Sequence, residues 1–241
     1  MAAEAYLAGR KALVTGGTRG IGHAIAEHFL DLGAAVTVSG TSANGAGPEG
    51  SAYLQADFTD AAATRAFADM IAAMGFDILV NNAGINVISP FAEINPDDFE
   101  RIQRVNVTAP MLLCRAVVPG MRAKGWGRIV NVSSIWGKIA KAQRGSYATS
   151  KFALDGMTTA LAAEVAGDGI LANCVAPGFI ETDLTRRVLG DDGIRELVRQ
   201  VPVGRLGQPE EIARFIAWLA GPDNTFISGQ NIAIDGGFTR V

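Results

Sequence analysis

The stretch that decides the fold is Thr15-Gly16-Gly17-Thr18-Arg19-Gly20-Ile21-Gly22. It follows a β-branched run over Lys11–Thr15 and precedes Gly20–Leu32, in which apolar residues recur with helical periodicity. Glycines between a strand and a helix let the backbone turn tightly and approach a pyrophosphate, which the free N–H groups of the helix N-terminus then bind. We therefore predict a dinucleotide-binding turn. The glycine spacing differs from the ordinary GxGxxG pattern, so a tight turn without a ligand is the alternative.

Short apolar runs alternate with longer helical segments along the rest of the chain. The predicted strands are Lys11–Thr15, Ala35–Ser39, Ala52–Ala56, Asp77–Asn81, Gly127–Ser133, Ile170–Ala176 and Asn231–Asp235. The predicted helices are Gly20–Leu32, Asp60–Met74, Pro96–Lys124, Ser146–Ala166 and Pro209–Ala220. This alternation is typical of the α/β class, and predicts a three-layer α/β/α Rossmann fold with a seven-stranded, mainly parallel sheet in one domain over residues 1–241. The glycine- and proline-rich Gly40–Ser51 is expected to be a loop where a crossover helix would otherwise lie.

Composition excludes several classes of protein. The net charge of −3 gives no electrostatic basis for binding nucleic acid. No apolar run reaches the roughly 20 residues needed to span a bilayer. Both cysteines, Cys114 and Cys174, lie in apolar surroundings, so we expect no disulfide framework, no metal site and a cytoplasmic location.

The end of the second strand bears on the choice of cofactor. An acidic residue there would bind the ribose 2′-hydroxyl of NAD and repel a 2′-phosphate. This chain has Thr41 and Ser42 instead, with Arg19 in the glycine turn. These residues favour NADP(H) over NAD(H), although Arg19 could also be a solvated residue at the rim.

A tyrosine and a lysine open the helix predicted from Ser146. Tyr147 and Lys151 are four residues apart and share one helix face. Tyrosine has a pKa of about 10, and a neighbouring ammonium lowers it toward the range useful for acid–base catalysis. Ser134, at the end of the fifth strand, could hold a substrate carbonyl; capping a turn is its alternative role, and Ser133 is the competing serine.

These motifs together resemble the short-chain dehydrogenase/reductase family. The resemblance extends from Lys11 to about Gly237, and its motifs occur in the family's order: TGGTRGIG, Asn81-Asn82-Ala83-Gly84, Asn106, Ser134, the YxxxK pair and Pro177-Gly178. The segments GTSANG, APGFIETD and SGQNIAIDGG are most similar to the 3-oxoacyl-[acyl-carrier-protein] reductase branch.

The resemblance implies a role for each matching residue. Tyr147 would be the acid–base residue, Lys151 would lower its pKa and hold the nicotinamide ribose, Ser134 would polarise the carbonyl, and Asn106 would hold a water that relays protons. In the turn, the implied cofactor contacts are Gly16, Thr18, Arg19, Gly20, Ile21 and Gly22. Beyond Thr41 and Ser42, they are Asp57 and Phe58 at the adenine, Asn82, Ala83 and Gly84 along the cleft, and Pro177, Gly178, Ile180 and Thr182 at the nicotinamide end. From the residues alone, Asn106 could equally be a buried helix asparagine, and Asp57 and Asn82 could be turn residues.

The function implied is an NADPH-dependent reductase of a ketone, either 3-oxoacyl-type or a related small ketone. The alternatives are an NAD(P)-dependent alcohol or sugar dehydrogenase running toward oxidation and, more remotely, a non-catalytic nucleotide-binding protein. Enoyl reductases space their tyrosine and lysine further apart, which argues against alkene reduction. The family commonly forms tetramers, so a homotetramer is expected.

Residues near the expected active-site entrance bear on the choice of substrate. Reductases of the 3-oxoacyl branch meet acidic acyl carrier proteins with arginines near the active-site entrance, but here the matching positions hold Asp168 and the neighbourhood of Lys124. These residues argue against a carrier-protein partner. The loop before Tyr147 carries Lys138, Lys141 and Arg144, which indicates either a solvated basic loop or a pocket for an anionic or sugar-like substrate.

Overall fold

Seven parallel strands form one sheet in the computed structural model, which describes residues 6–240 apart from the side chains of residues 183, 184 and 187–189. Residues 1–5 and 241 of the predicted domain lie outside the described residues. The strand order is β3-β2-β1-β4-β5-β6-β7, and every pairing is parallel. The strands are β1 (Lys11–Val14), β2 (Ala35–Gly40), β3 (Ala52–Gln55), β4 (Ile78–Asn81), β5 (Gly127–Val132), β6 (Ile170–Pro177) and β7 (Asn231–Ile234).

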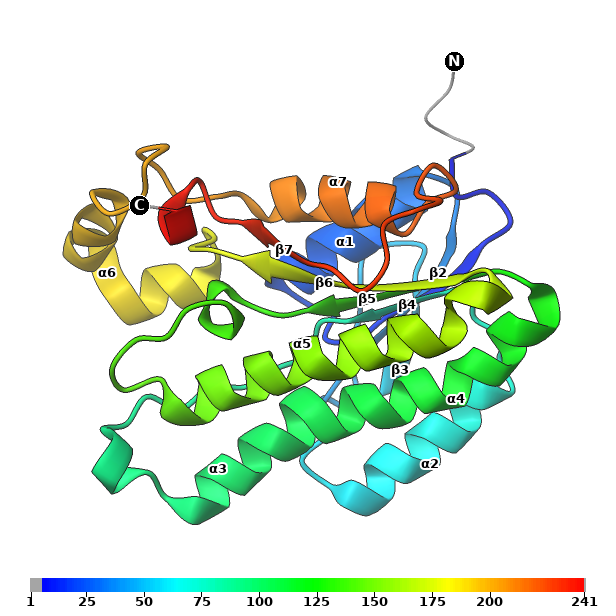
Figure 1. Cartoon of the computed structure of the whole chain (residues 1–241), viewed down its shortest axis with the longest axis horizontal. Coiled ribbons are helices and arrows are strands. Elements are labelled where there is room, and N and C mark those ends of the chain that lie inside the picture. Colours follow the sequence, from blue (N-terminus) through cyan, green and yellow to red (C-terminus); the bar gives the residue numbers. More distant parts are fainter. Residues whose placement is uncertain (1–5, 241) are drawn as a thin grey trace.

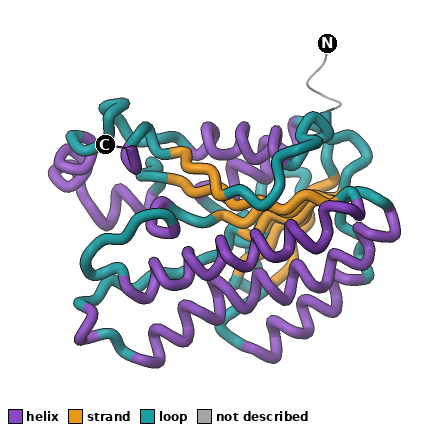
Figure 2. Tube along the Cα trace, viewed as in Figure 1, coloured by secondary structure: helices purple, strands orange, loops and turns teal. Residues whose placement is uncertain are grey.

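Helices cover both faces of this sheet (Figure 1). The α-helices are α1 (Gly20–Asp31), α2 (Ala61–Ala72), α3 (Pro96–Gln103), α4 (Ala109–Lys124), α5 (Gly145–Val165), α6 (Asp183–Val198) and α7 (Pro209–Leu219). Helices α1 and α7 pack together on one face, and α2, α4 and α5 form the layer on the other, as the tube in Figure 2 also shows. Two apolar cores separate these layers from the sheet. The predicted three-layer Rossmann fold is confirmed.

The direction in which successive strands are added to the sheet reverses between β1 and β4. Strands β2 and β3 follow β1 to one side, and β4 then pairs on the opposite side of β1. In open parallel sheets, ligands bind outside the carboxyl ends of the strands at such a switch in order. The topology therefore places a candidate site where β1 and β4 end.

The predicted long helix over Pro96–Lys124 is interrupted. A π-helical segment, η3 (Arg104–Thr108), separates α3 from α4 and contains the buried Asn106. π-segments inside α-helices occur frequently at functional sites. The helical periodicity of apolar residues runs through this segment, so the pattern does not reveal the interruption of the helix.

Helix α6 is the element that the sequence pattern did not predict. Its sequence is mostly polar, and its two arms meet at Gly190, which has non-helical backbone angles of φ 60° and ψ 179°. An interior glycine and the lack of an apolar stripe make such a segment resemble a loop. By contrast, the predicted loop at Gly40–Ser51 contains no helix and packs on Tyr53, whose hydroxyl donates to the Ser42 carbonyl at 2.5 Å.

Candidate active site

The glycine turn after β1 is packed so closely that its glycines are required. A Cβ on Gly22 would lie 2.3 Å from the Gly16 carbonyl oxygen and 2.4 Å from Nδ2 of Asn82. Gly16 and Gly20 have positive φ angles of 65° and 55°, which favour glycine. The first turn of α1 has no side-chain cap, and the leading N–H groups of a helix have no acceptor within the helix. The cradle fits a phosphate group.

Asn82 and Thr15 hold the cradle in place from the neighbouring strands. Nδ2 of Asn82 donates to the carbonyls of Thr15 and Gly16 at 3.0 and 3.1 Å. Oγ1 of the buried Thr15 accepts from the backbone N–H groups of Asn82 and Ala83, both at 3.0 Å. Asn82 therefore braces the turn, and Thr15 is a site residue that the sequence analysis missed. Its position at the head of the glycine motif was the available signal.

Arg19 and the end of β2 lie at the outer side of this cradle. A Cβ on Gly40 would lie 2.8 Å from the methyl group of Thr18, which places the glycine turn beside the end of β2. Arg19, Thr41 and Ser42 are exposed, and their side chains make no hydrogen bond to the other side chains and backbone groups that the structure describes. The loop is held by its backbone instead, since Gln55 Nε2 donates to the Thr41 carbonyl at 3.1 Å. The three side chains are thus free to meet a ligand.

The two residues after β3 have different surroundings. Asp57 is exposed, and its Oδ1 accepts from the backbone N–H and hydroxyl of Thr59 at 2.9 and 2.7 Å, as a turn residue would. Phe58 is buried and packs edge-on against Phe67, with ring centroids 5.6 Å apart. The predicted contact of Phe58 with a cofactor can therefore come only from its backbone.

The segment after β6 reaches the glycine turn from the other side. The methyl group of Thr182 lies 3.6 Å from where a Cβ on Gly20 would be. Oγ1 of Thr182 also accepts from the Thr185 N–H at 3.2 Å and so caps α6. Gly178 packs directly against the backbone of Asp235, where a Cβ would come within 2.7 Å. Pro177 ends β6 and Ile180 is buried beside them. The structure thus brings the predicted cofactor residues after β1 and β6 together.

Tyr147 and Lys151 lie on one turn of α5, next to the end of β5. Nζ of Lys151 lies 5.5 Å from the centre of the Tyr147 ring and donates to the Val132 carbonyl at 2.8 Å. Burial lowers the pKa of Lys151 to about 8. Burial raises the pKa of Tyr147, and the Ser134 hydroxyl and Arg144 guanidinium oppose that rise. In the chain alone the pKa of Tyr147 lies above its ordinary value, because the desolvation of the phenol is the largest effect; that Lys151 and a bound cofactor lower this pKa stays a prediction.

Ser134 is the second residue after β5 and lies beside Tyr147. It caps the short helix η4 (Ile135–Gly137), since its Oγ accepts from the Trp136 N–H at 3.2 Å. The capping role and the catalytic role coexist, because a hydroxyl that accepts one hydrogen bond still has its proton to donate. Ser133, the competing serine, is buried, with its Oγ 3.3 Å from the Lys151 carbonyl. Ser134 is therefore the serine whose hydroxyl acts on Tyr147.

Asn106 holds the loop after β4 in place. Its Oδ1 accepts from the Ile85 N–H and its Nδ2 donates to the Ile85 carbonyl, both at 2.9 Å. Nδ2 also lies 3.0 Å from the Ser150 hydroxyl on α5. A Cβ on Gly84 would lie 3.4 Å from Oδ1 of Asn106 and 3.7 Å from Nζ of Lys151, so this loop lies between the two residues. Asn106 thus has the backbone-bonded role of a buried asparagine, beside Lys151.

Comparison with known proteins identifies the family. A family model described as "Enoyl-(Acyl carrier protein) reductase" matches residues 16–239. The 3-oxoacyl-[acyl-carrier-protein] reductase FabG of Vibrio cholerae serotype O1 is 40% identical over 98% of this chain and 99% of its own length. This chain belongs to the short-chain dehydrogenase/reductase family.

Two solved members of this family are similar to the chain in structure. The gluconate 5-dehydrogenase of Burkholderia cenocepacia J2315, in complex with NADP and tartrate, is 34% identical with a TM-score of 0.90 over 99% of both chains. A 3-oxoacyl (acyl-carrier-protein) reductase from Agrobacterium tumefaciens C58 with NADP bound is 32% identical, with a TM-score of 0.88 over 95% of this chain and 94% of that one. The predicted family and fold are confirmed.

In this short-chain dehydrogenase/reductase, Asp168 does not lie beside Tyr147. It lies two residues before β6, at the amino end of the parallel sheet, and its carboxylate pairs with Arg122 at 2.6 Å. Lys124 is at the same end, where it pairs with Asp77 at 2.6 Å. The site occupies the carboxyl end. The expectation that these positions flank the active-site entrance is therefore wrong within one chain.

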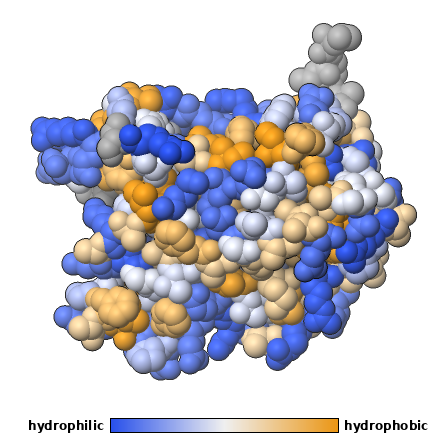
Figure 3. All heavy atoms as spheres, viewed as in Figure 1, coloured by the Kyte–Doolittle hydropathy of each residue, from blue (hydrophilic) through white to orange (hydrophobic). Residues whose placement is uncertain are grey.

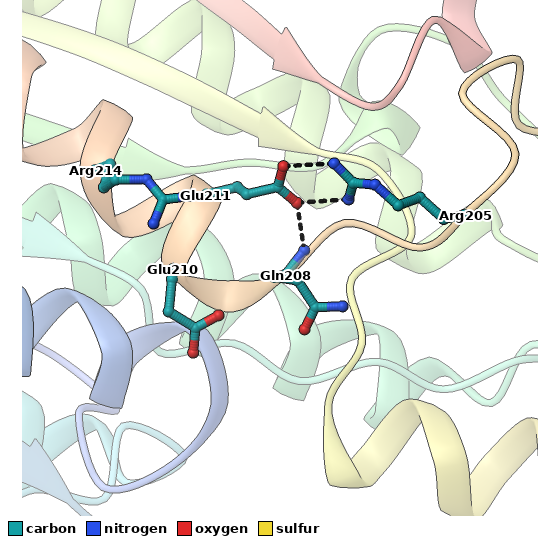
Figure 4. A pocket seen from close by; sticks show the side chains of 5 residues that line it. All are labelled: Arg205, Gln208, Glu210, Glu211 and Arg214. Atoms are coloured by element: carbon teal, nitrogen blue, oxygen red, sulfur yellow. Dashed lines mark hydrogen bonds and ion pairs between the residues drawn. The ribbon is translucent and has the colours of Figure 1, made fainter.

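A surface depression near the start of α7 is built from a different set of side chains. It is lined by Arg205, Gln208, Glu210, Glu211 and Arg214 (Figure 4). Glu211 receives two hydrogen bonds of 2.7 Å from Arg205 and a third, of 2.8 Å, from the Gln208 N–H. These bonds lower the pKa of Glu211 to about 2. All three hydrogen bonds to the Glu211 carboxylate come from the chain itself, so the cluster anchors the start of α7.

Within the described residues no group of three or more His, Cys, Asp or Glu side chains could hold a metal, and no helix is long and apolar enough to cross a membrane.

Proposed function

We propose that this chain is an NADP(H)-dependent oxidoreductase that reduces the carbonyl of a small ketone, including 3-oxoacyl compounds. The observation that carries the proposal is the position of Tyr147 and Lys151, one turn apart on α5 and beside Ser134, at the sheet end that also holds the glycine cradle. The relatives named 3-oxoacyl-[acyl-carrier-protein] reductase and the NADP in the similar structures support it.

The predicted cofactor-binding residues would hold the dinucleotide across the carboxyl ends of the strands, where β1 and β4 end. The cradle formed by Gly16, Gly20 and Gly22 would hold the pyrophosphate, with Thr18 and Ile21 completing the turn. Arg19, Thr41 and Ser42 would meet the 2′-phosphate, because no carboxylate stands at the end of β2 to repel it. The remaining proposed contacts are the Asp57 and Phe58 backbone, Asn82, Ala83, Gly84, Pro177, Gly178, Ile180 and Thr182. When bound, NADPH supplies the hydride that reduces the carbonyl carbon.

The side chains supply the proton and the polarisation. Ser134 would donate a hydrogen bond to the carbonyl oxygen, and the Tyr147 hydroxyl would give its proton to that oxygen. Because burial raises the pKa of Tyr147, the phenol is protonated at neutral pH and ready to act as the acid. The Lys151 ammonium would stabilise the phenolate left behind and hold the nicotinamide ribose, and Asn106 would keep the adjoining loop in position. The four-residue separation of Tyr147 and Lys151 argues for a carbonyl rather than an alkene as substrate.

The second candidate is an alcohol or sugar dehydrogenase running toward oxidation. The similarity to a gluconate 5-dehydrogenase favours it, and the same Tyr147 would then act as the base. A panel of ketones, 3-oxoacyl thioesters (free and carrier-linked) and sugar acids, assayed with NADPH, NADH, NADP⁺ and NAD⁺ by nicotinamide absorbance, separates the candidates. Reduction of ketones with NADPH supports the proposal; turnover only of alcohols, or of nothing, contradicts it.

The proposal extends to assembly and location. Large apolar side chains are exposed on the outer helices, including Met111 on α4, Phe152 on α5 and Trp218 on α7. Figure 3 shows hydrophobic residues gathered over α7 on the face that it displays. These surfaces support a homotetramer, and the two buried free cysteines fit a cytoplasmic location.

A further inference from the structure

Arg144 is a half-buried arginine whose guanidinium has no partner in the part of the chain that the structure describes. It immediately precedes α5 and lies three residues before Tyr147. Among the described side chains, which exclude those of residues 183, 184 and 187–189, Arg144 has neither an ion pair nor a side-chain hydrogen bond, whereas the arginines in ion pairs there have more exposed side chains. A partly desolvated charge without a partner is costly to keep in a folded protein.

The backbone around Arg144 is fixed from both sides. Its own N–H donates to the Lys141 carbonyl at 3.2 Å, and its carbonyl accepts from Ala148 at 2.7 Å. The preceding Gln143 has a positive φ of 66°, the one non-glycine residue with a positive φ among those described, and its carbonyl accepts from the Ser89 N–H. Strained backbone of this kind persists where the surroundings enforce it, and it clusters at ligand sites. The backbone of Arg144, from which the side chain projects, is therefore held in place at the start of α5.

The Arg144 guanidinium interacts electrostatically with the Tyr147 phenol. Burial lowers the pKa of Arg144, and among the side chains that the structure describes the titratable group that opposes this is the Tyr147 phenol. The same guanidinium opposes the rise in the pKa of Tyr147. The Arg144 guanidinium is thus a cation near Tyr147 for which the described part of the chain supplies no anion. A substrate could supply that anion.

We propose that Arg144 binds a carboxylate of the substrate, so that the protein acts preferentially on oxo acids or hydroxy acids rather than on neutral ketones. The inference rests on the proposed function, since it concerns the same site. A guanidinium presents a planar fork of donors that matches a carboxylate in two parallel hydrogen bonds. Bound in this way, the acid would be oriented with its carbonyl toward Tyr147 and Ser134.

The test compares acetoacetate with methyl acetoacetate, which differ at the carboxylate. With NADPH, we expect the unmodified protein to have the higher kcat/KM for the acid. Arg144→Met should lower kcat/KM for acetoacetate by about 10–100-fold, the loss typical of a charged hydrogen bond. The ester should fall only a few-fold, through the altered pKa of Tyr147. Arg144→Lys should restore part of the preference, and Lys141→Met, which removes an exposed charge from the same loop, should leave the ratio unchanged.

Equal losses for acid and ester in Arg144→Met would overturn the inference, and so would a ratio near one in the unmodified protein. Calorimetric titration of acetoacetate into the protein saturated with NADP⁺ gives a readout without turnover. Binding that is lost in Arg144→Met and retained in Lys141→Met supports the carboxylate site even if no substrate is reduced. In that case the proposed reductase function fails while the inference about Arg144 stands; absence of Arg144-dependent binding rejects the inference itself.

Discussion

Particular charged groups at the two ends of the sheet differ in whether the chain supplies them with a partner. At the amino end, Asp77 accepts from the Lys11 N–H at 2.8 Å and from Lys124 at 2.6 Å, and Arg122 pairs with Asp168. At the carboxyl end, by contrast, Arg19 and Arg144 have no partner among the residues that the structure describes. Charges that serve the fold are satisfied within it, and charges left unsatisfied next to a cradle of glycines are available to ligands.

Neutral amides hold two of the loops at the carboxyl end in place. Asn82 ties the glycine turn to β4, and Asn106 ties the loop after β4 to the π-segment. Both side chains are neutral, so these contacts involve no charged group. A site can therefore be rigid while its cations remain uncompensated, which is the arrangement expected of a preorganised binding site. Three substitutions test whether the two ends differ in function as they do in charge.

Tyr147→Phe should have the largest effect. It removes the hydroxyl that we propose as the acid and keeps the ring, so kcat should fall by about 10²–10⁴-fold, as expected for the loss of a general acid. NADPH affinity, followed by nicotinamide fluorescence, should change little. Tyr6→Phe is the matched control, because Tyr6 packs against Gly221 away from the site. Near-normal turnover in Tyr147→Phe would remove the basis of the catalytic assignment.

Local patterns were enough to predict the fold and much of the site. The strands and the glycine turn depend on residues close together in sequence, and the seven-stranded sheet and the family are confirmed. NADP(H) is supported by the similar structures that contain NADP. The π-segment around Asn106 was not predicted, because a helical apolar pattern runs through it, and helix α6 was not predicted, because it has no periodic apolar pattern. The catalytic and cofactor-binding roles of the individual residues remain predictions.

Features that depend on distance in space could not be predicted from the sequence. Asp168 precedes the same strand that leads to Pro177, but the eight-residue length of β6 puts the two at opposite ends of the sheet. The pKa of Tyr147 likewise depends on how deeply the phenol is buried, which the YxxxK spacing does not specify. Whether the Arg144 side chain has a partner likewise depends on how the surrounding loops fold, which local patterns do not specify.

Arg19→Ala should have an intermediate effect that is confined to one cofactor. Removing a charged hydrogen bond to the 2′-phosphate should weaken NADPH binding by about 1.5–3 kcal/mol and leave NADH binding nearly unchanged. Fluorescence titration with both cofactors measures the difference. Arg65→Ala, which removes an exposed arginine from α2, controls for the change in net charge. Equal weakening of NADPH and NADH would show that Arg19 does not read the phosphate.

Arg128→Met should have the smallest effect, and it should act on stability instead of activity. Arg128 is buried at the amino end of β5, where it donates to the carbonyls of Gly127, Gly169 and Asn224 and stacks on Trp126. Burial lowers its pKa to about 10, so the guanidinium is charged at neutral pH, and the carbonyls lose a strong donor when it is removed. We expect the free energy of unfolding to fall by about 1–3 kcal/mol, partly offset because methionine is easier to bury. Urea denaturation measures this loss, and kcat/KM with NADPH should stay within two-fold of the unmodified protein under native conditions. A large fall in kcat/KM without a change in stability would mean that charges at the amino end also serve the reaction, which would break the distinction between the two ends of the sheet.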